Sequence, residues 1–244
     1  MQTPTPLLLL PGLLCDEAVW RDQRAALNEI ECVVPTYGHA NTIAAMAQVA
    51  LDSMAAPRFA LAGHSMGGRV ALEIARLAPE RVERLALLDT GISALAAGEA
   101  GTREVAGRNA LLDVARAHGM RAMGAQWARG MVHPDQLQTP LFDEILAMIE
   151  RRTVEEFAAQ IHALVHRPDA TAVLVGLDCP VLLLCGREDG WSPLERHQEM
   201  HRLCPASRLV VVEHSGHMTT MEQPHAVSRA LRTWMTYSQT KETI

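Results

Sequence analysis

The chain has 244 residues, 48% of them hydrophobic, and a formal net charge of −6 at pH 7. This length and apolar content suit one large domain with a substantial core. The negative balance, without a run of lysine or arginine, argues against nucleic acid or an anionic membrane as a partner, so a small molecule is expected.

Short apolar runs alternate with amphipathic stretches in the first third of the chain. Strands are predicted over 7–10, 31–35, 58–62 and 82–88, and helices over 20–27, 42–54 and 69–78. Strands that alternate with helices indicate right-handed crossovers and a mostly parallel, doubly wound sheet with helices on both faces.

Between residues 92 and 176 no strand is evident, and the segment is rich in alanine, methionine and arginine at helical spacing. The alternation then resumes with strands over 180–185 and 208–212 and helices over 193–203 and 222–237. We therefore expect a core domain made of residues 1–91 and 177–244. Residues 92–176 are expected to form a helical lid inserted after the strand that ends near Asp89, above the strand ends.

The apolar run PLLLLPGLL near the N-terminus is interpreted as a buried strand and a turn, because it has no basic region before it and is interrupted by Pro11-Gly12. No apolar stretch reaches the roughly 18 residues of a membrane span. Five cysteines without C-x-x-C spacing predict neither a disulfide framework nor a zinc site, and a cytoplasmic location is expected.

The segment GHSMGG places Ser65 between Gly63 and Gly67 in the pattern G-x-S-x-G, after a predicted strand and before a predicted helix. Such a sharp reversal crowds the backbone unless the flanking residues lack side chains. The turn would lift the Ser65 hydroxyl above the sheet, close to the backbone N–H of Met66 and the positive end of the helix dipole. This is the setting that a serine nucleophile requires.

A serine hydroxyl needs a base, and the base needs a group that orients it. His217 lies in the loop SGHMTTMEQP after the predicted strand 208–212, and Asp189 lies in GREDGWSP after the strand 180–185. Because the carboxyl ends of parallel strands share one edge, these side chains can meet Ser65. His217 would move the proton of Ser65, and Asp189 would fix the tautomer of His217.

Together, these three segments and their order resemble the α/β-hydrolase superfamily over nearly the whole chain. The loop LLLLPGLLCDEAVW is similar to the oxyanion loop of that superfamily, with Pro11 where a histidine is usual. The resemblance implies that the backbone N–H groups of Leu13 and Met66 form the oxyanion hole.

The sequence also offers other candidates for the orienting acid and for the base. Asp89 ends the strand after the nucleophile helix, a position that holds the acid in some relatives, and Glu188 adjoins Asp189. We favour Asp189, because its surroundings match the resemblance more closely. His64 is interpreted as a neighbour that fills the turn rather than as the base.

Two histidine pairs are spaced by one helical turn, His162 with His166 and His197 with His201, but neither has the glutamate of H-E-x-x-H or an evident third ligand. We predict no metal and no cofactor. Cys15, near the oxyanion loop, is interpreted as a small buried residue. Trp127, in the predicted lid, is a candidate substrate-binding residue.

The expected reaction is hydrolysis of a carboxylic ester, a small acyl or aryl ester or a lactone, through an acyl-enzyme on Ser65. One alternative is a lyase or carbon–carbon hydrolase, because GHSMGGR is similar to the motif of the menaquinone-pathway synthases, whose arginine binds a carboxylate. Arg69 is thus a second candidate substrate-binding residue, although we favour a helix-surface position for it. Another alternative is a ligand-binding protein that has kept the fold without the activity.

Overall fold

In the computed structural model, which describes residues 4–236, six strands form one sheet in the order β2-β1-β3-β4-β5-β6, and all neighbouring strands are parallel. The strands are β1 (Leu7–Leu10), β2 (Cys32–Val33), β3 (Phe59–His64), β4 (Val82–Leu88), β5 (Val181–Gly186) and β6 (Arg208–Val212). Every residue of β1, β3 and β5 is buried, as expected for strands covered on both faces. The predicted α/β architecture with a parallel, doubly wound sheet is confirmed.

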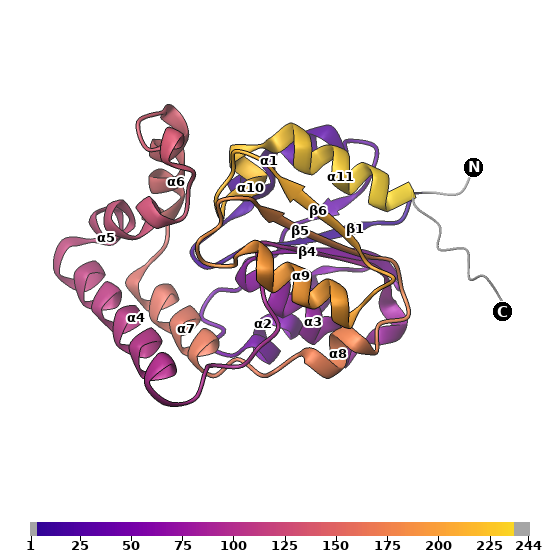
Figure 1. Ribbon diagram of the computed structural model, residues 1–244, viewed down its shortest axis with the longest axis horizontal. Coiled ribbons are helices and arrows are strands. Elements are labelled where there is room, and N and C mark those ends of the chain that lie inside the picture. The colour runs from indigo at the N-terminus through magenta and orange to yellow at the C-terminus, as the bar shows by residue number, and fades with distance from the viewer. Residues whose placement is uncertain (1–3, 237–244) are drawn as a thin grey trace.

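Helices cover both faces of this sheet (Figure 1). On one face lie α1 (Arg21–Ala26), α10 (Thr219–Glu222) and α11 (Pro224–Thr236), which contact one another. On the other lie α2 (Ile43–Ser53), α3 (Met66–Leu77), α8 (Thr171–Val175) and α9 (Leu194–Leu203). The parallel strands therefore direct their carboxyl ends toward a single edge of the core.

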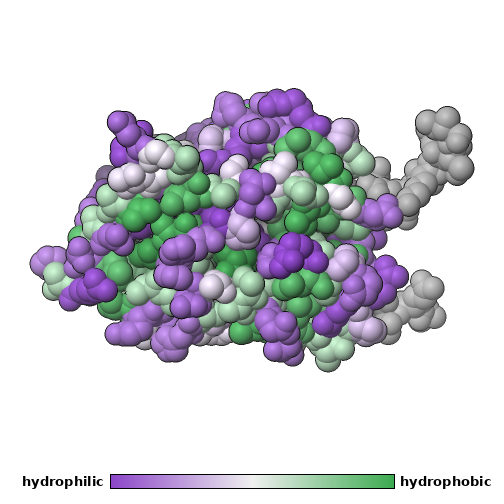
Figure 2. All heavy atoms as spheres, turned by 90° about the horizontal axis from the view of Figure 1, so that it is seen from below, coloured by the Kyte–Doolittle hydropathy of each residue, from purple (hydrophilic) through white to green (hydrophobic). Residues whose placement is uncertain are grey.

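The segment 92–176 contains helices and short turns and, in this fully described stretch, no strand. Its helices α4 (Gly98–His118), α5 (Met120–Trp127), α6 (Pro140–Glu150) and α7 (Val154–Val165) stand beyond the carboxyl edge of the sheet, at the left of Figure 1. Seen from below, apolar residues gather over this left part of the molecule among hydrophilic ones (Figure 2). The last helix, α8, instead packs against α3 and α9 of the core.

Apart from shifts of up to three residues at their ends, two predicted elements differ from the structure. The strand expected over 31–35 is reduced to the two residues of β2, which lies at the edge of the sheet and, among the described strands, pairs only with β1. The helix expected from residue 222 is divided at Gln223, whose φ of −132° and ψ of 58° are not helical. Pro224 then begins α11, because proline disfavours a helical residue before it. The predicted end of this helix at residue 237 lies outside the described residues.

Among residues 4–236, no helix combines the length and the apolarity that crossing a bilayer demands.

Candidate active site

Ser65 lies in a strained turn between β3 and α3, with φ 54° and ψ −117°. The flanking glycines permit this turn. A Cβ on Gly63 would lie 2.3 Å from the carbonyl oxygen of Gly67, and one on Gly67 would lie 2.1 Å from that of Leu10. Neither position accepts a larger residue without movement of the backbone, so the spacing of the two glycines holds Ser65 at the carboxyl edge of the sheet.

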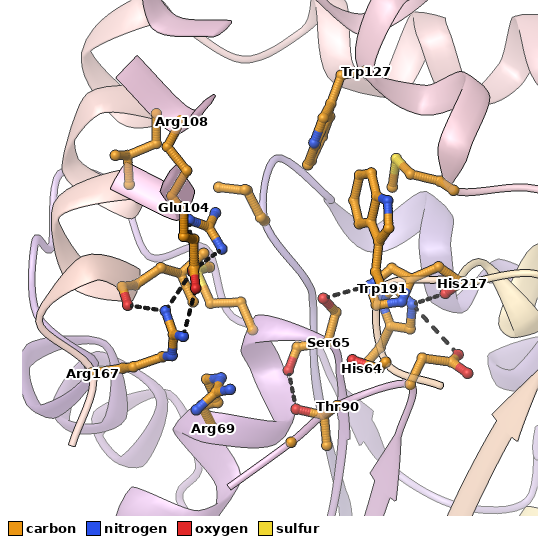
Figure 3. Close-up of a pocket in the computed structure, with 18 of the residues that line it drawn as sticks. His64, Ser65, Arg69, Thr90, Glu104, Arg108, Trp127, Arg167, Trp191 and His217 are labelled. Carbon is orange, nitrogen blue, oxygen red and sulfur yellow. Dashed lines mark hydrogen bonds and ion pairs between the residues drawn. The ribbon is translucent and has the colours of Figure 1, made fainter. Parts of the chain in front are cut away.

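A chain of hydrogen bonds joins Ser65, His217 and Asp189, and Figure 3 shows Ser65 and His217 within it. His217 Nε2 lies 2.8 Å from Ser65 Oγ, and His217 Nδ1 lies 2.8 Å from Asp189 Oδ2. The other carboxylate oxygen of Asp189 accepts the N–H groups of Trp191, at 2.8 Å, and Ser192, at 2.9 Å. Burial alone would raise the pKa of Asp189, but His217 and these two N–H groups outweigh it and lower the pKa, which keeps the carboxylate charged.

Asp89, the alternative acid, is fully buried but makes no hydrogen bond to His217. Its oxygens accept the hydroxyl of Thr219 at 2.5 Å and the N–H of Gly186 at 3.1 Å. Burial and the neighbouring charge of Asp189 raise the pKa of Asp89 well above its ordinary value, which favours the neutral acid. The geometry therefore gives the orienting position to Asp189 rather than to Asp89.

His64 occupies the space beneath His217. It is 1% exposed, and its Nε2–H donates to the backbone oxygen of His217 at 2.8 Å. Burial and the nearby His217 lower the pKa of His64 to about 4, so its ring is neutral near pH 7. His64 thus supports the backbone of the loop that carries His217.

The loop after β1 approaches Ser65 closely. A Cβ on Gly12 would lie 3.2 Å from Ser65 Cβ, and Cys15 N–H closes the turn onto the oxygen of Gly12 at 3.1 Å. Pro11 stands where a histidine is usual in the superfamily. Its carbonyl oxygen accepts a hydrogen bond from the hydroxyl of Tyr37 at 3.3 Å. These contacts fix the loop near the nucleophile, and Leu13 lines the same cavity as Ser65.

A cavity of about 390 Å³ lies above Ser65, and the four candidates Leu13, Met66, Arg69 and Trp127 all line it. The preferred position of Arg69 on the helix surface is wrong: its side chain is partly buried and faces the cavity (Figure 3). Helical spacing could not reveal this, because Ser93, which accepts a hydrogen bond from Arg69, and the neighbouring Arg167 both belong to the segment 92–176.

Aromatic side chains form the wall next to His217. The ring centroids of Trp191 and His217 are 5.2 Å apart, those of Trp127 and Trp191 5.1 Å, and those of Trp127 and Phe157 6.3 Å. Trp191 was not among the sequence candidates, although it stands two residues after Asp189 in GREDGWSP. This wall offers an apolar, planar surface on the histidine side of the site.

Sequence reasoning also missed two buried polar residues that hold the loops in place. Glu222 accepts the N–H groups of Gly216 and Met218, each at 3.0 Å, and that of His133 at 2.6 Å. Gln160, on α7, accepts the N–H of Leu14 at 2.8 Å. Glu222 lies only five residues after His217, a weak signal, whereas nothing in the sequence links Gln160 to the first loop.

Within residues 4–236, no group of three or more histidine, cysteine or acidic residues could hold a metal ion. His162 and His166 stack with centroids 4.2 Å apart, and His201 bonds to Ser207 at 2.8 Å. Cys15 is buried, and burial raises the pKa of its thiol to about 12. The thiol of Cys15 is therefore protonated near pH 7 and unsuited to act as a nucleophile.

A model of the alpha/beta hydrolase family matches residues 7–230. A Pseudomonas savastanoi pv. phaseolicola protein named as a proposed carbamate hydrolase, RutD, is 29% identical, with 93% of this chain and 92% of that protein covered. A Bacillus subtilis protein named as a proposed 2-succinyl-6-hydroxy-2,4-cyclohexadiene-1-carboxylate synthase is 28% identical over 82% of this chain and 73% of its own. The solved structure of a thermophilic esterase from Thermogutta terrifontis, with malate bound, is similar with a TM-score of 0.84 and 29% identity, over 96% of this chain and 90% of that one.

Proposed function

The chain belongs to the alpha/beta hydrolase family, and we propose that it is a serine hydrolase that cleaves carboxylic esters or lactones through an acyl-enzyme. The observation that carries the proposal is the unbroken hydrogen-bond chain from Ser65 through His217 to Asp189, at the floor of a cavity. Similarity to a solved esterase supports the choice of substrate class. Segment 92–176 would serve as the lid of the site.

In the first step, Ser65 Oγ attacks the ester carbonyl while His217 Nε2 takes the hydroxyl proton. The backbone N–H groups of Leu13 and Met66 would stabilise the oxyanion, a contribution of roughly 3 kcal/mol per donor in enzymes where it has been measured. The bond to the alkoxy oxygen then breaks, and the alcohol leaves with the proton held by His217. In the second step, water gives a proton to His217 and attacks the acyl carbon, which releases the carboxylic acid and returns the proton to Ser65.

The proposal is tested by measuring the intact mass of the protein after brief exposure to a fluorophosphonate. We expect one adduct on the wild type and none on Ser65→Ala, and His217→Ala should react far more slowly because the serine loses its base. Asn109→Ala, an exposed change on α4, is the control and should react like the wild type. A folded wild type that forms no adduct would refute an activated serine and leave a ligand-binding protein as the better explanation.

A lyase or carbon–carbon hydrolase acting on a carboxylate-bearing substrate is the second candidate, favoured by the position of Arg69 in the cavity and by the relative named as a synthase. Turnover in ¹⁸O-labelled water, with identification of both products, separates these reactions. Hydrolysis of an ester or of a carbon–carbon bond places one solvent oxygen in the product acid, whereas elimination places none. Ester hydrolysis also releases an alcohol, whereas carbon–carbon hydrolysis releases a product with a new C–H bond.

A further inference from the structure

The cavity carries an excess of positive charge on one side. Five arginines line it, namely Arg69, Arg103, Arg108, Arg167 and Arg196. Among the described residues, the acids in the lining are Asp89 and Glu104. Glu104, on α4, already pairs with two of the arginines: with Arg108 at 2.9 Å and with Arg167 at 2.7 Å. Asp89 pairs with none of the five, and Arg103 pairs with Glu99 at 3.2 Å, which leaves Arg69 and Arg196 as the described arginines of the lining without a carboxylate partner.

Of these two, Arg69 shares a backbone oxygen with another arginine. Its Nη1 donates to the carbonyl oxygen of Ser93 at 2.8 Å, and within the described part of the chain no carboxylate lies within 4.0 Å of its guanidinium. Arg167 donates to the same oxygen of Ser93 at 3.3 Å, so one carbonyl draws two positive groups together. Burial, followed by the charges of Arg167 and Arg196, lowers the pKa of Arg69 to about 9. An anion placed against these groups would relieve this repulsion.

The two sides of the cavity differ in a way that orients a substrate. Arg69, Arg108 and Arg167 lie on one side of Ser65, and Trp191 and His217 lie on the other (Figure 3). The alcohol part of an ester must lie next to His217, because His217 Nε2 returns its proton. The acyl chain then extends from the carbonyl carbon away from His217, toward the arginines.

We propose that Arg69, together with Arg167, binds a carboxylate at the far end of the acyl chain, so that the preferred substrate is a half-ester of a dicarboxylic acid with an uncharged alcohol part. This assignment rests on the proposed hydrolase activity of the same site. Glu104 holds Arg167 in place through two hydrogen bonds, at 2.7 and 2.9 Å, and its single charge leaves the cluster positive.

The test compares three esters of similar size, with hydrolysis followed by the acid released. Monomethyl glutarate carries the charge on the acyl part, methyl pentanoate carries none, and pentanoyloxyacetate carries it on the alcohol part. We expect the wild type to prefer monomethyl glutarate to both others in kcat/KM. Arg69→Gln should lower kcat/KM for monomethyl glutarate by about 10- to 100-fold and change that for methyl pentanoate by less than about twofold.

Arg121→Gln is the matched control, because Arg121 is a surface arginine of α5 that pairs with Asp143 and Glu150 outside the cavity. It should leave all three rates unchanged. Retained fluorophosphonate labelling of Arg69→Gln shows that the variant is folded with an intact nucleophile. Arg69→Lys, which keeps the charge, should recover part of the preference.

A second measurement does not depend on turnover. Glutarate should slow fluorophosphonate labelling of the wild type at lower concentration than pentanoate does, and this difference should vanish in Arg69→Gln. Equal losses for charged and neutral esters, a preference for pentanoyloxyacetate, or equal protection by glutarate and pentanoate would each overturn the carboxylate site while labelling persists. Absence of labelling in the wild type would overturn the hydrolase proposal and this inference with it.

Discussion

Replacement of Asp189 by asparagine should show whether Asp189 or Asp89, the two acids at the strand ends, orients His217. One oxygen of Asp189 accepts the N–H groups of Trp191 and Ser192, at 2.8 and 2.9 Å. The oxygen of an asparagine would take that place, because an amide NH₂ there would face two donors. The NH₂ group would then face His217 Nδ1, 2.8 Å away in the wild type.

An NH₂ group against Nδ1 forces that nitrogen to accept, which moves the ring proton of His217 to Nε2. A protonated Nε2 donates to Ser65 Oγ and can no longer take its proton. We therefore expect Asp189→Asn to lower kcat by about 10³- to 10⁴-fold. This corresponds to about 4 to 5.5 kcal/mol in the activation free energy.

Asp89→Asn is the matched control, since Asp89 is equally buried and contacts Thr219 and Gly186 instead of His217. Its raised pKa favours a neutral carboxyl, which asparagine resembles in size and charge. Its kcat should fall by less than about tenfold. Rates are measured on a chromogenic ester after circular dichroism has shown that both variants fold. If Asp89→Asn lost more activity than Asp189→Asn, the assignment of the orienting acid would be wrong.

Two carboxylates that hold loops around the site give further predictions. Glu222→Ala leaves three N–H groups without their acceptor. It should lower the free energy of unfolding by roughly 3 kcal/mol, and it should lower kcat/KM by about 100-fold because His217 shifts. An unchanged midpoint of urea unfolding would argue against this. Burial alone would raise the pKa of Glu104, but Arg167 and Arg108 lower it to about 2. The charged Glu104 therefore contributes its full stabilisation of the folded state above the ordinary pKa of 4.5, and this contribution is lost as the pH falls toward 2. Glu104→Gln should therefore be less stable than the wild type by about 1 kcal/mol in urea at pH 7, and a difference that grew rather than shrank at pH 3 would contradict this reasoning.

The parts of the fold that were predicted correctly depend on local patterns. β1, β4 and β6 have the predicted bounds, because each is a short apolar run that ends at a turn residue. The proximity of Ser65, His217 and Asp189 also followed from the sequence, because a parallel sheet brings the carboxyl ends of its strands to one edge. Because the strands of such a sheet have fixed relative positions, the order of the segments along the chain predicts where the residues after each strand lie.

Residues whose role depends on distant contacts could not be predicted in this way. Gln160 accepts a hydrogen bond from Leu14, which is 146 positions away in the sequence, and Arg167 donates to Glu104, which is 63 positions away. Helical periodicity identifies which side of a helix is apolar, but not which loop that side will cover. Arg69 was misplaced for the same reason, since its own helix gives no sign of the segment that closes over it.

The contacts of the segment 92–176 divide into two kinds with different consequences for activity. Near His217 this segment forms part of the catalytic geometry itself, because the N–H of His217 donates to the oxygen of Met131 at 2.5 Å and Glu222 binds the N–H of His133. At the opposite side of the cavity, the contacts of Arg167 bear on charge and not on the position of any reacting atom. Changes at the first contact should therefore alter labelling of Ser65 and turnover together, whereas changes at the second should alter the choice of ester while the reactivity of Ser65 is retained.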